Sequence, residues 1–129
     1  MAIPQSDLAS LTERGLCFQV SEESNMTCIV FSNYCLPPGC TTAQSDLMIR
    51  LSPGYPDVPP DMWWFSPAVQ LTSGRVIEAT QVIERHLGRD WQRWSRHFNG
   101  GQWRPGIDSL ESFLALVHRE VVRSVKGCP

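Results

Sequence analysis

Apolar and polar positions divide the first half of the chain into short strands. Residues 16–20 and 26–34 are apolar and rich in β-branched side chains, and the polar residues 21–25 separate them. This pattern predicts two paired strands joined by a turn. Residues 46–51 predict a third strand, and residues 62–65 predict a short fourth one.

The segment between the third and fourth predicted strands is rich in proline. Residues 52–60 contain four prolines, and proline fixes its own φ and cannot donate to a sheet ladder. We therefore expect a stiff, extended loop there rather than a tight hairpin.

Helical spacing is clearest near the C-terminus. Asp108 and Glu111 match a capping box, and Gly127 ends the run. The apolar positions between them follow a helical period: Leu110, Phe113, Leu114, Val117, Val121 and Val125.

Two further segments have helical features. Ser6 and Asp7 predict the cap of a short helix that runs to Arg14, before Gly15. Residues 80–86 have local helical character. The order of elements predicts an α+β fold in which the C-terminal helix packs on one face of an antiparallel meander, with residues 1–129 as a single domain.

Composition and charge narrow the function classes. The 129 residues are 42% hydrophobic and 19% charged, with a net charge of −2, which excludes a disordered chain and argues against a nucleic-acid-binding protein. Apolar runs are too short to span a membrane. The N-terminus has no features of a signal peptide, so we expect a cytoplasmic protein.

The five cysteines are expected to be reduced thiols. Cys17 and Cys28 lie in apolar stretches and are predicted core residues. Cys35 and Cys40 flank a Leu-Pro-Pro-Gly turn, but no further ligands follow at the spacing of a zinc finger. We expect no metal and no cofactor.

The proline-rich loop resembles a known motif. Tyr55, Pro56, Pro59 and Pro60 form a Tyr-Pro-x-x-Pro-Pro pattern like that of the ubiquitin-conjugating-enzyme (UBC) fold. Three blocks along the chain resemble the bacterial UBC-like proteins of prokaryotic family E: LMIRLSPGYPDVPPDMWWF, WQRWSRHFN and WRPGIDSLESFLALVHRE. The resemblance implies a UBC-like fold and a role in ubiquitin-like conjugation, with phage defence as one such role. The implied partners are a ThiF-type activating enzyme and a ubiquitin-like or multi-ubiquitin protein.

The sequence departs from the family pattern at the catalytic thiol. UBC enzymes carry the ubiquitin-like tail on a cysteine about eight residues before a tryptophan that corresponds to Trp103. That position falls near Ser95, and no cysteine occurs between Cys40 and Cys128. A thioester requires a thiolate nucleophile, so the usual chemistry is missing.

Three residues near this position are candidate catalytic groups. His97 is a candidate general base for Ser95, and its alternative is a histidine hydrogen-bonded within a polar loop. Asn99 follows His97 in a segment similar to the family's His-Pro-Asn motif, whose asparagine stabilises an oxyanion. A chance match or a remnant of that motif is the alternative. His86 is a second candidate, and its alternative is a helix-end histidine favoured by the helix dipole. His118 is interpreted as a surface residue.

The densest signal is a run of tryptophans and arginines. Aromatic residues and arginines dominate binding hot spots, and the net charge favours a protein partner over single-stranded nucleic acid. The alternative is a tryptophan core built with Trp63 and Trp64. The candidate partner-binding residues are Trp91, Trp94, Arg96, Trp103 and Arg104.

Two functions therefore remain open. The first is a UBC-like scaffold that lacks the catalytic cysteine, a pseudoenzyme, and binds the activating enzyme or the ubiquitin-like protein. The second is a non-standard conjugating enzyme that carries the tail on Ser95, His97 or a displaced cysteine. A stand-alone peptide-binding module is a third, weaker interpretation.

Overall fold

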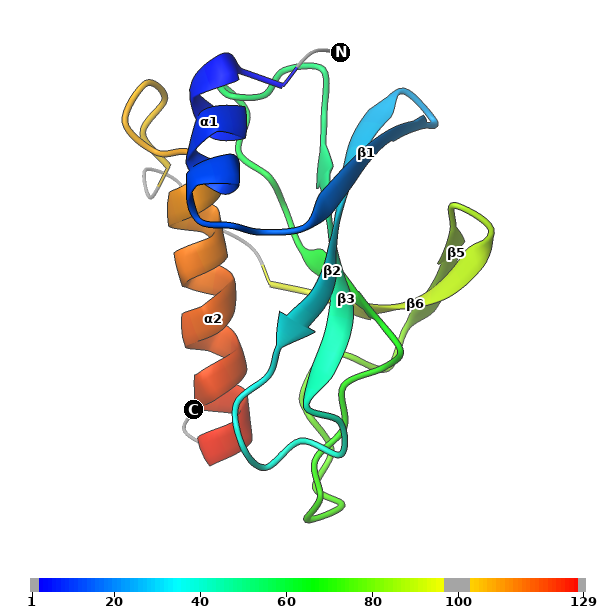
Figure 1. The fold of residues 1–129 in the computed structure, drawn as a ribbon. Helices are drawn as coiled ribbons and strands as arrows, with labels where there is room; N and C mark the ends of the chain where they lie inside the picture. The colour runs from blue at the N-terminus through cyan, green and yellow to red at the C-terminus, as the bar shows by residue number, and fades with distance from the viewer. Residues whose placement is uncertain (1–2, 97–102, 128–129) are drawn as a thin grey trace.

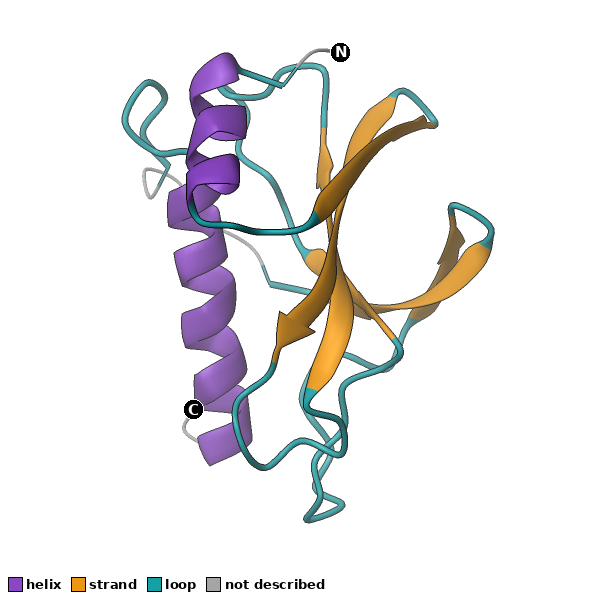
Figure 2. Cartoon of the chain, in the orientation of Figure 1, coloured by secondary structure: helices purple, strands orange, loops and turns teal. Residues whose placement is uncertain are grey.

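The computed structural model describes residues 3–96 and 103–127. Two helices lie on one side of a curled antiparallel sheet (Figures 1 and 2). The elements, in chain order, are α1 (Gln5–Glu13), β1 (Phe18–Glu23), β2 (Met26–Cys35), β3 (Gln44–Leu51), β4 (Trp63–Ser66), β5 (Ile83–His86), β6 (Arg89–Trp94) and α2 (Leu110–Lys126).

The sheet has six strands in the order β1-β2-β3-β4-β6-β5. Both hairpins at its edges turn through two residues of positive φ, Ser24–Asn25 before β2 and Leu87–Gly88 before β6. Turns of this kind match the right-handed twist of paired strands. The third-to-fourth connection is a proline-rich loop rather than a tight hairpin, as predicted, and it brings β4 beside β3. It is not extended, because the Tyr55 N–H donates to the Ser52 carbonyl and the Val58 N–H to the Gly54 carbonyl, which folds the loop into turns.

Alternation along the strands gives the sheet two apolar faces. On the helix side, Ile29, Ile49, Trp63 and Phe65 pack with the apolar stripe of α2. Their neighbours Cys28, Met48 and Trp64 point to the opposite face, where they form a smaller cluster with Trp91 of β6. Because successive side chains of a strand point to opposite faces, the paired tryptophans of β4 serve both clusters.

An ionic network covers the smaller cluster and joins the two edge hairpins. His86 lies between two carboxylates, 2.9 Å from Glu23 and 3.1 Å from Glu84. Glu23 also accepts the Leu87 N–H at 2.7 Å, and Glu84 pairs with Arg93 at 2.8 Å. The network ties the β1–β2 hairpin to the β5–β6 hairpin across the concave face of the curled sheet (Figure 1).

A buried carboxylate connects α1, the proline-rich loop and α2. Asp7 is 4% exposed. It accepts a hydrogen bond from the Tyr55 hydroxyl at 2.7 Å and another from the Leu110 N–H at 3.2 Å. Burial and the Asp7 carboxylate both raise the pKa of the Tyr55 hydroxyl, which therefore stays a donor. A second contact between the helices runs from the Ser10 hydroxyl to Glu111.

The predicted helix caps are wrong in detail. The N-cap of α1 is Pro4, so Ser6 and Asp7 lie inside the helix, and Asp7 caps the start of α2 instead. The capping box of α2 is formed by Ser109 and Ser112 rather than by Asp108 and Glu111. Both corrections have one cause: a short polar side chain bonds to whichever N–H the fold brings near it.

Two other predictions are corrected. Residues 80–86 do not form a helix, because residues 83–86 pair with β6 as strand β5. Cys17 is exposed, since it lies in the connection between α1 and β1 rather than inside a strand. The α+β class, the packing of the C-terminal helix on the sheet and the burial of Cys28 agree with the predictions. Within the described residues no helix is long and apolar enough to cross a membrane.

We expect Asp7→Ala to lower the free energy of unfolding by about 3 kcal/mol, because it leaves the Tyr55 hydroxyl and the Leu110 N–H buried without an acceptor. Tyr55→Phe removes only one partner and should cost about 1 kcal/mol. Urea denaturation followed by tryptophan fluorescence measures both. Asp57→Ala, at an exposed position of the same loop, is the control. A loss for Asp7→Ala no larger than that of the control would contradict the role given to this carboxylate.

Stability should also depend on pH through Glu23. Hydrogen bonds from the Leu87 N–H and from His86, with a smaller effect of Arg50, hold the pKa of Glu23 below its ordinary value although burial opposes them. A lowered folded-state pKa stabilises the fold above the unfolded pKa of about 4.3, and this contribution is lost as the pH falls through the folded value. We expect Glu23→Gln to flatten the decline of the urea midpoint below about pH 5. The exposed Glu13→Gln should leave that decline unchanged, and an equal slope in both variants would refute the assignment.

Candidate functional site

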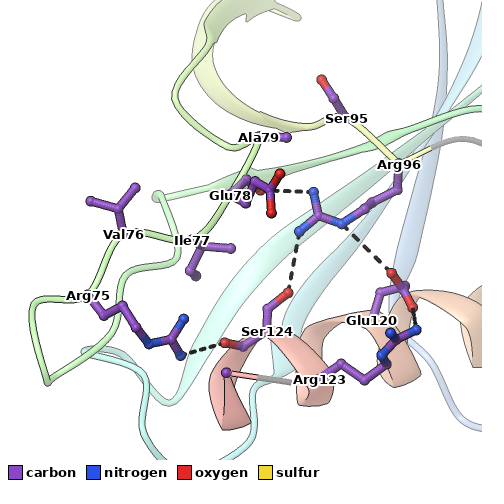
Figure 3. Close-up of a pocket in the computed structure, with 11 residues that line it drawn as sticks. Arg75, Val76, Ile77, Glu78, Ala79, Ser95, Arg96, Glu120, Arg123 and Ser124 are labelled. Carbon is purple, nitrogen blue, oxygen red and sulfur yellow. Dashed lines mark hydrogen bonds and ion pairs between the residues drawn. The ribbon is translucent and has the colours of Figure 1, made fainter. Parts of the chain in front are cut away.

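Ser95 lies at the edge of a polar pocket that follows the end of β6. The pocket has a volume of about 530 Å³ and lies between residues 75–79, the end of β6 and the C-terminal half of α2. Figure 3 shows the Ser95 hydroxyl directed away from the other lining residues and Arg96 reaching across toward α2. The Ser95 N–H donates to the Ala79 carbonyl at 3.0 Å, so the main chain holds Ser95 against the 75–79 segment.

Arg96 is the central side chain of this pocket. Its guanidinium donates to the Glu78 carbonyl at 3.0 Å and to the Ser124 hydroxyl at 3.3 Å, and it lies 3.8 Å from Glu120 (Figure 3). It also stacks over the Trp94 ring at 5.1 Å. Burial lowers the pKa of this guanidinium, and the charges of Glu120 and Glu78 oppose that effect. Arg96 thus connects β6 to α2.

The described residues place no base against the Ser95 hydroxyl. Its oxygen accepts a hydrogen bond from Arg93 Nε at 3.2 Å, and a guanidinium cannot take up the proton of a nucleophile. The candidate base His97 and the candidate oxyanion residue Asn99 lie outside the described residues. The catalytic roles of all three residues remain predictions.

The tryptophans divide between core and surface. Trp94 belongs to the helix-side core and Trp91 to the opposite cluster, with 0% and 1% of their surface exposed. Trp63 and Trp64 are buried as well. The core interpretation therefore describes four of the five tryptophans, and the indoles of Trp91 and Trp94 do not reach the surface on which a partner would dock.

Trp103 contacts two residues of the Tyr-Pro-x-x-Pro-Pro motif. Its Nε1–H donates to the Pro56 carbonyl at 2.8 Å, and its ring lies 6.2 Å from that of Tyr55. Pro60 is buried and Pro59 half-buried in the same loop. The Tyr-Pro-x-x-Pro-Pro motif thus supports the segment that leads into α2.

Arg104 is the exposed member of the predicted partner-binding set. Its N–H donates to Asp108 at 2.7 Å, and its carbonyl accepts the N–H groups of Ile107 and Asp108. Its side chain is 67% exposed, and its Nε lies 3.9 Å from the Asp108 carboxylate. A closed turn therefore presents a cation and the 68%-exposed Ile107 together, which suits protein binding.

The other candidate groups lie elsewhere. His86 belongs to the ionic network on the far face of the sheet, and His118 is exposed on α2. Burial raises the pKa of the Cys28 and Cys40 thiols, which disfavours the reactive thiolate. Among the described residues, no group of three or more histidine, cysteine, aspartate or glutamate side chains converges in a way that would hold a metal ion.

Several pocket residues carry no recognisable sequence signal. Arg75 donates to the carbonyls of Ser124 and Val125 at the end of α2, and it comes from an irregular segment without periodicity. Glu120 and Ser124 are four positions apart on α2, so they share a helix face. This spacing was the one feature of the sequence that could have indicated the pocket, and it is equally typical of any solvent-exposed helix face.

Comparison with known proteins identifies the family. The model of prokaryotic E2 family E matches residues 3–124, and the chain belongs to that family. No curated protein and no solved structure matches the chain. Membership indicates a component of a conjugation pathway, and proteins of this kind interact in general with ubiquitin-like proteins and activating enzymes.

Truncating one buried tryptophan and one exposed arginine to alanine tests the assignment of these side chains to the core and to the surface. We expect Trp91→Ala to lower the free energy of unfolding by about 3 to 5 kcal/mol, because it leaves a cavity in the smaller cluster. Arg104→Ala should cost less than about 1 kcal/mol, since its ion pair is exposed. Equal losses in urea denaturation would show that the two side chains have been assigned to the wrong environments.

Proposed function

We propose that this member of prokaryotic E2 family E is a UBC-like scaffold, with residues 1–129 as one UBC-like domain. It binds an activating enzyme of the ThiF type, a ubiquitin-like protein or both, and carries no acyl group itself. The observation that carries the proposal is the bonding of Ser95 at the position of the usual thiol. Its hydroxyl accepts from Arg93 Nε rather than donating to a described base.

The described cysteines support the same proposal. Cys28 lies on the face of the sheet opposite the helices, and Cys40 is half-buried. Cys17 and Cys35 are exposed, but neither lines the pocket beside Ser95. A displaced thiol would need both a lowered pKa and a position beside the bound tail, and none of these four combines them.

The proposed partner surface is the turn that starts at Trp103. Trp103 is anchored on Pro56, so the exposed Arg104 and Ile107 are held in place before a partner arrives. Preorganised groups lose little conformational entropy on binding. The cationic Arg104 suits an acidic patch on the partner, and the polar pocket beside Ser95 suits the extended C-terminal tail of a ubiquitin-like protein, with Arg75 and Arg123 near its carboxylate.

We expect Arg104→Glu to weaken binding to the cognate activating enzyme or ubiquitin-like protein by about tenfold or more, because it places a like charge against the partner. Isothermal titration calorimetry with the purified proteins measures the affinity. Arg119→Glu, at an exposed position of α2, changes the net charge equally and should alter affinity by less than about twofold.

The scaffold proposal also predicts the effect of replacing Ser95. Ser95→Ala should support conjugation in the reconstituted pathway at the wild-type rate, because no bond to its oxygen forms or breaks. Loss of conjugation by Ser95→Ala, with partner affinity unchanged, would favour the non-standard enzyme instead. An absence of binding to either partner would overturn the proposed function altogether.

A further inference from the structure

One edge of the sheet is open for pairing. β5 is the terminal strand, and β6 is its one partner within the described residues. The Val82 carbonyl accepts the Arg93 N–H at 2.9 Å, so the residues of β5 that bond to β6 are the alternate ones, Glu84 and His86. Ile83 and Arg85 therefore direct their backbone N–H and C=O groups outward, away from β6.

A cavity with a largely aliphatic but partly polar lining adjoins this open edge. Its volume is about 460 Å³, and its lining includes Val69, Leu71, Val76, Ile77, Ile83 and Gln92. The amide of Gln92 is already used, since Oε1 accepts the Val69 N–H at 2.8 Å and Nε2 donates to the Val69 carbonyl at 3.1 Å. The Gln92 amide is therefore not free for a ligand, although the polar Gln70, Thr80 and Gln81 also line the cavity beside the apolar residues.

Exposed apolar side chains gather around the same place. Val76 and Ile83 line the cavity and are 67% and 56% exposed, whereas Val82 is 44% exposed on the same face as Glu84. Monomeric proteins seldom leave such residues grouped at an unpaired strand unless something binds there.

Two arginines, Arg75 and Arg85, lie on the cavity side of this edge, and Asp90 lies beside Arg85. Arg75 is the one charged residue that lines the cavity. Arg85 points to the same side as Ile83 and donates to the Gly88 carbonyl at 2.8 Å. Its pair with Asp90 is 68% and 69% exposed, so that ion pair is weak. Glu84 points to the opposite face, where it accepts from Trp64 and pairs with Arg93.

We propose that β5 accepts an extended segment of a partner protein as a seventh strand. The segment carries an apolar residue beside Ile83, which enters the cavity, and an acidic residue two positions away, which pairs with Arg85. Main-chain hydrogen bonds to Ile83 and Arg85 supply affinity, and the two side chains supply specificity, as in strand-addition complexes. This surface is separate from the turn at Arg104 and does not depend on the proposed conjugation role.

A synthetic peptide tests the proposal. The probe is a fluorescein-labelled, end-capped heptapeptide, Thr-Val-Thr-Asp-Thr-Val-Thr, and the control replaces its aspartate with lysine. We expect saturable binding of the aspartate peptide by fluorescence anisotropy, with the lysine peptide at least about tenfold weaker. The amide protons of Ile83 and Arg85 should become protected from exchange, whereas those of the other edge strand, β1, should not.

Two variants of the full chain complete the test. Ile83→Pro removes an outward N–H without touching a bond to β6, since proline is tolerated at strand edges, and should weaken binding about tenfold. Arg85→Glu should reverse the preference between the two peptides, which keeps the test valid if Ile83→Pro fails to fold. No saturable binding, equal affinity for both peptides, or protection along β1 instead of β5 would overturn the proposal.

Discussion

The Asp7 carboxylate is the contact on which the arrangement of the molecule depends. It holds the hydroxyl of Tyr55 and the first N–H of α2 at once, and so fixes three segments that are distant in sequence. Tyr55 packs against Trp103, and Trp103 bonds to the loop that carries Tyr55. The proline-rich motif therefore supports the segment that leads into α2. The exposed turn at Arg104 is held in place by the same contacts.

A two-sided sheet explains why the tryptophan-rich segment is mostly core. Along β6, Trp91 faces the smaller cluster and Trp94 faces α2, while Arg93 and Arg96 bind neighbouring polar groups. Both faces need large apolar side chains, because the helices cover one face and the curled edge hairpins cover the other. Most of the aromatic and arginine residues that resemble a binding hot spot in the sequence therefore have structural roles. Arg104 is the exposed member of the predicted partner-binding set.

Periodic and motif-based features were predictable, whereas contacts between distant segments were not. The stripe of α2 and its end at Gly127 follow from spacing, and the first hairpin follows from two apolar runs around a polar turn. Strand β5 was not predicted because three of its four residues, Glu84, Arg85 and His86, are polar. The alternation of apolar and polar positions that is typical of a strand is therefore absent. The roles of Asp7 and Arg75 could not be predicted from the sequence, because tertiary packing decides which group a polar side chain bonds to. The match to the family rested on residues spread over the whole chain, which is why it held while local caps did not.

The central claim is that the protein belongs to a conjugation pathway yet carries no acyl group. Its most direct test is the intact mass of the protein after incubation with its activating enzyme, its ubiquitin-like protein and ATP, under non-reducing conditions. The scaffold account predicts an unchanged mass for this chain while the activating enzyme becomes charged. A mass increase equal to the ubiquitin-like protein less one water, mapped to Ser95, His97 or a cysteine, would contradict it.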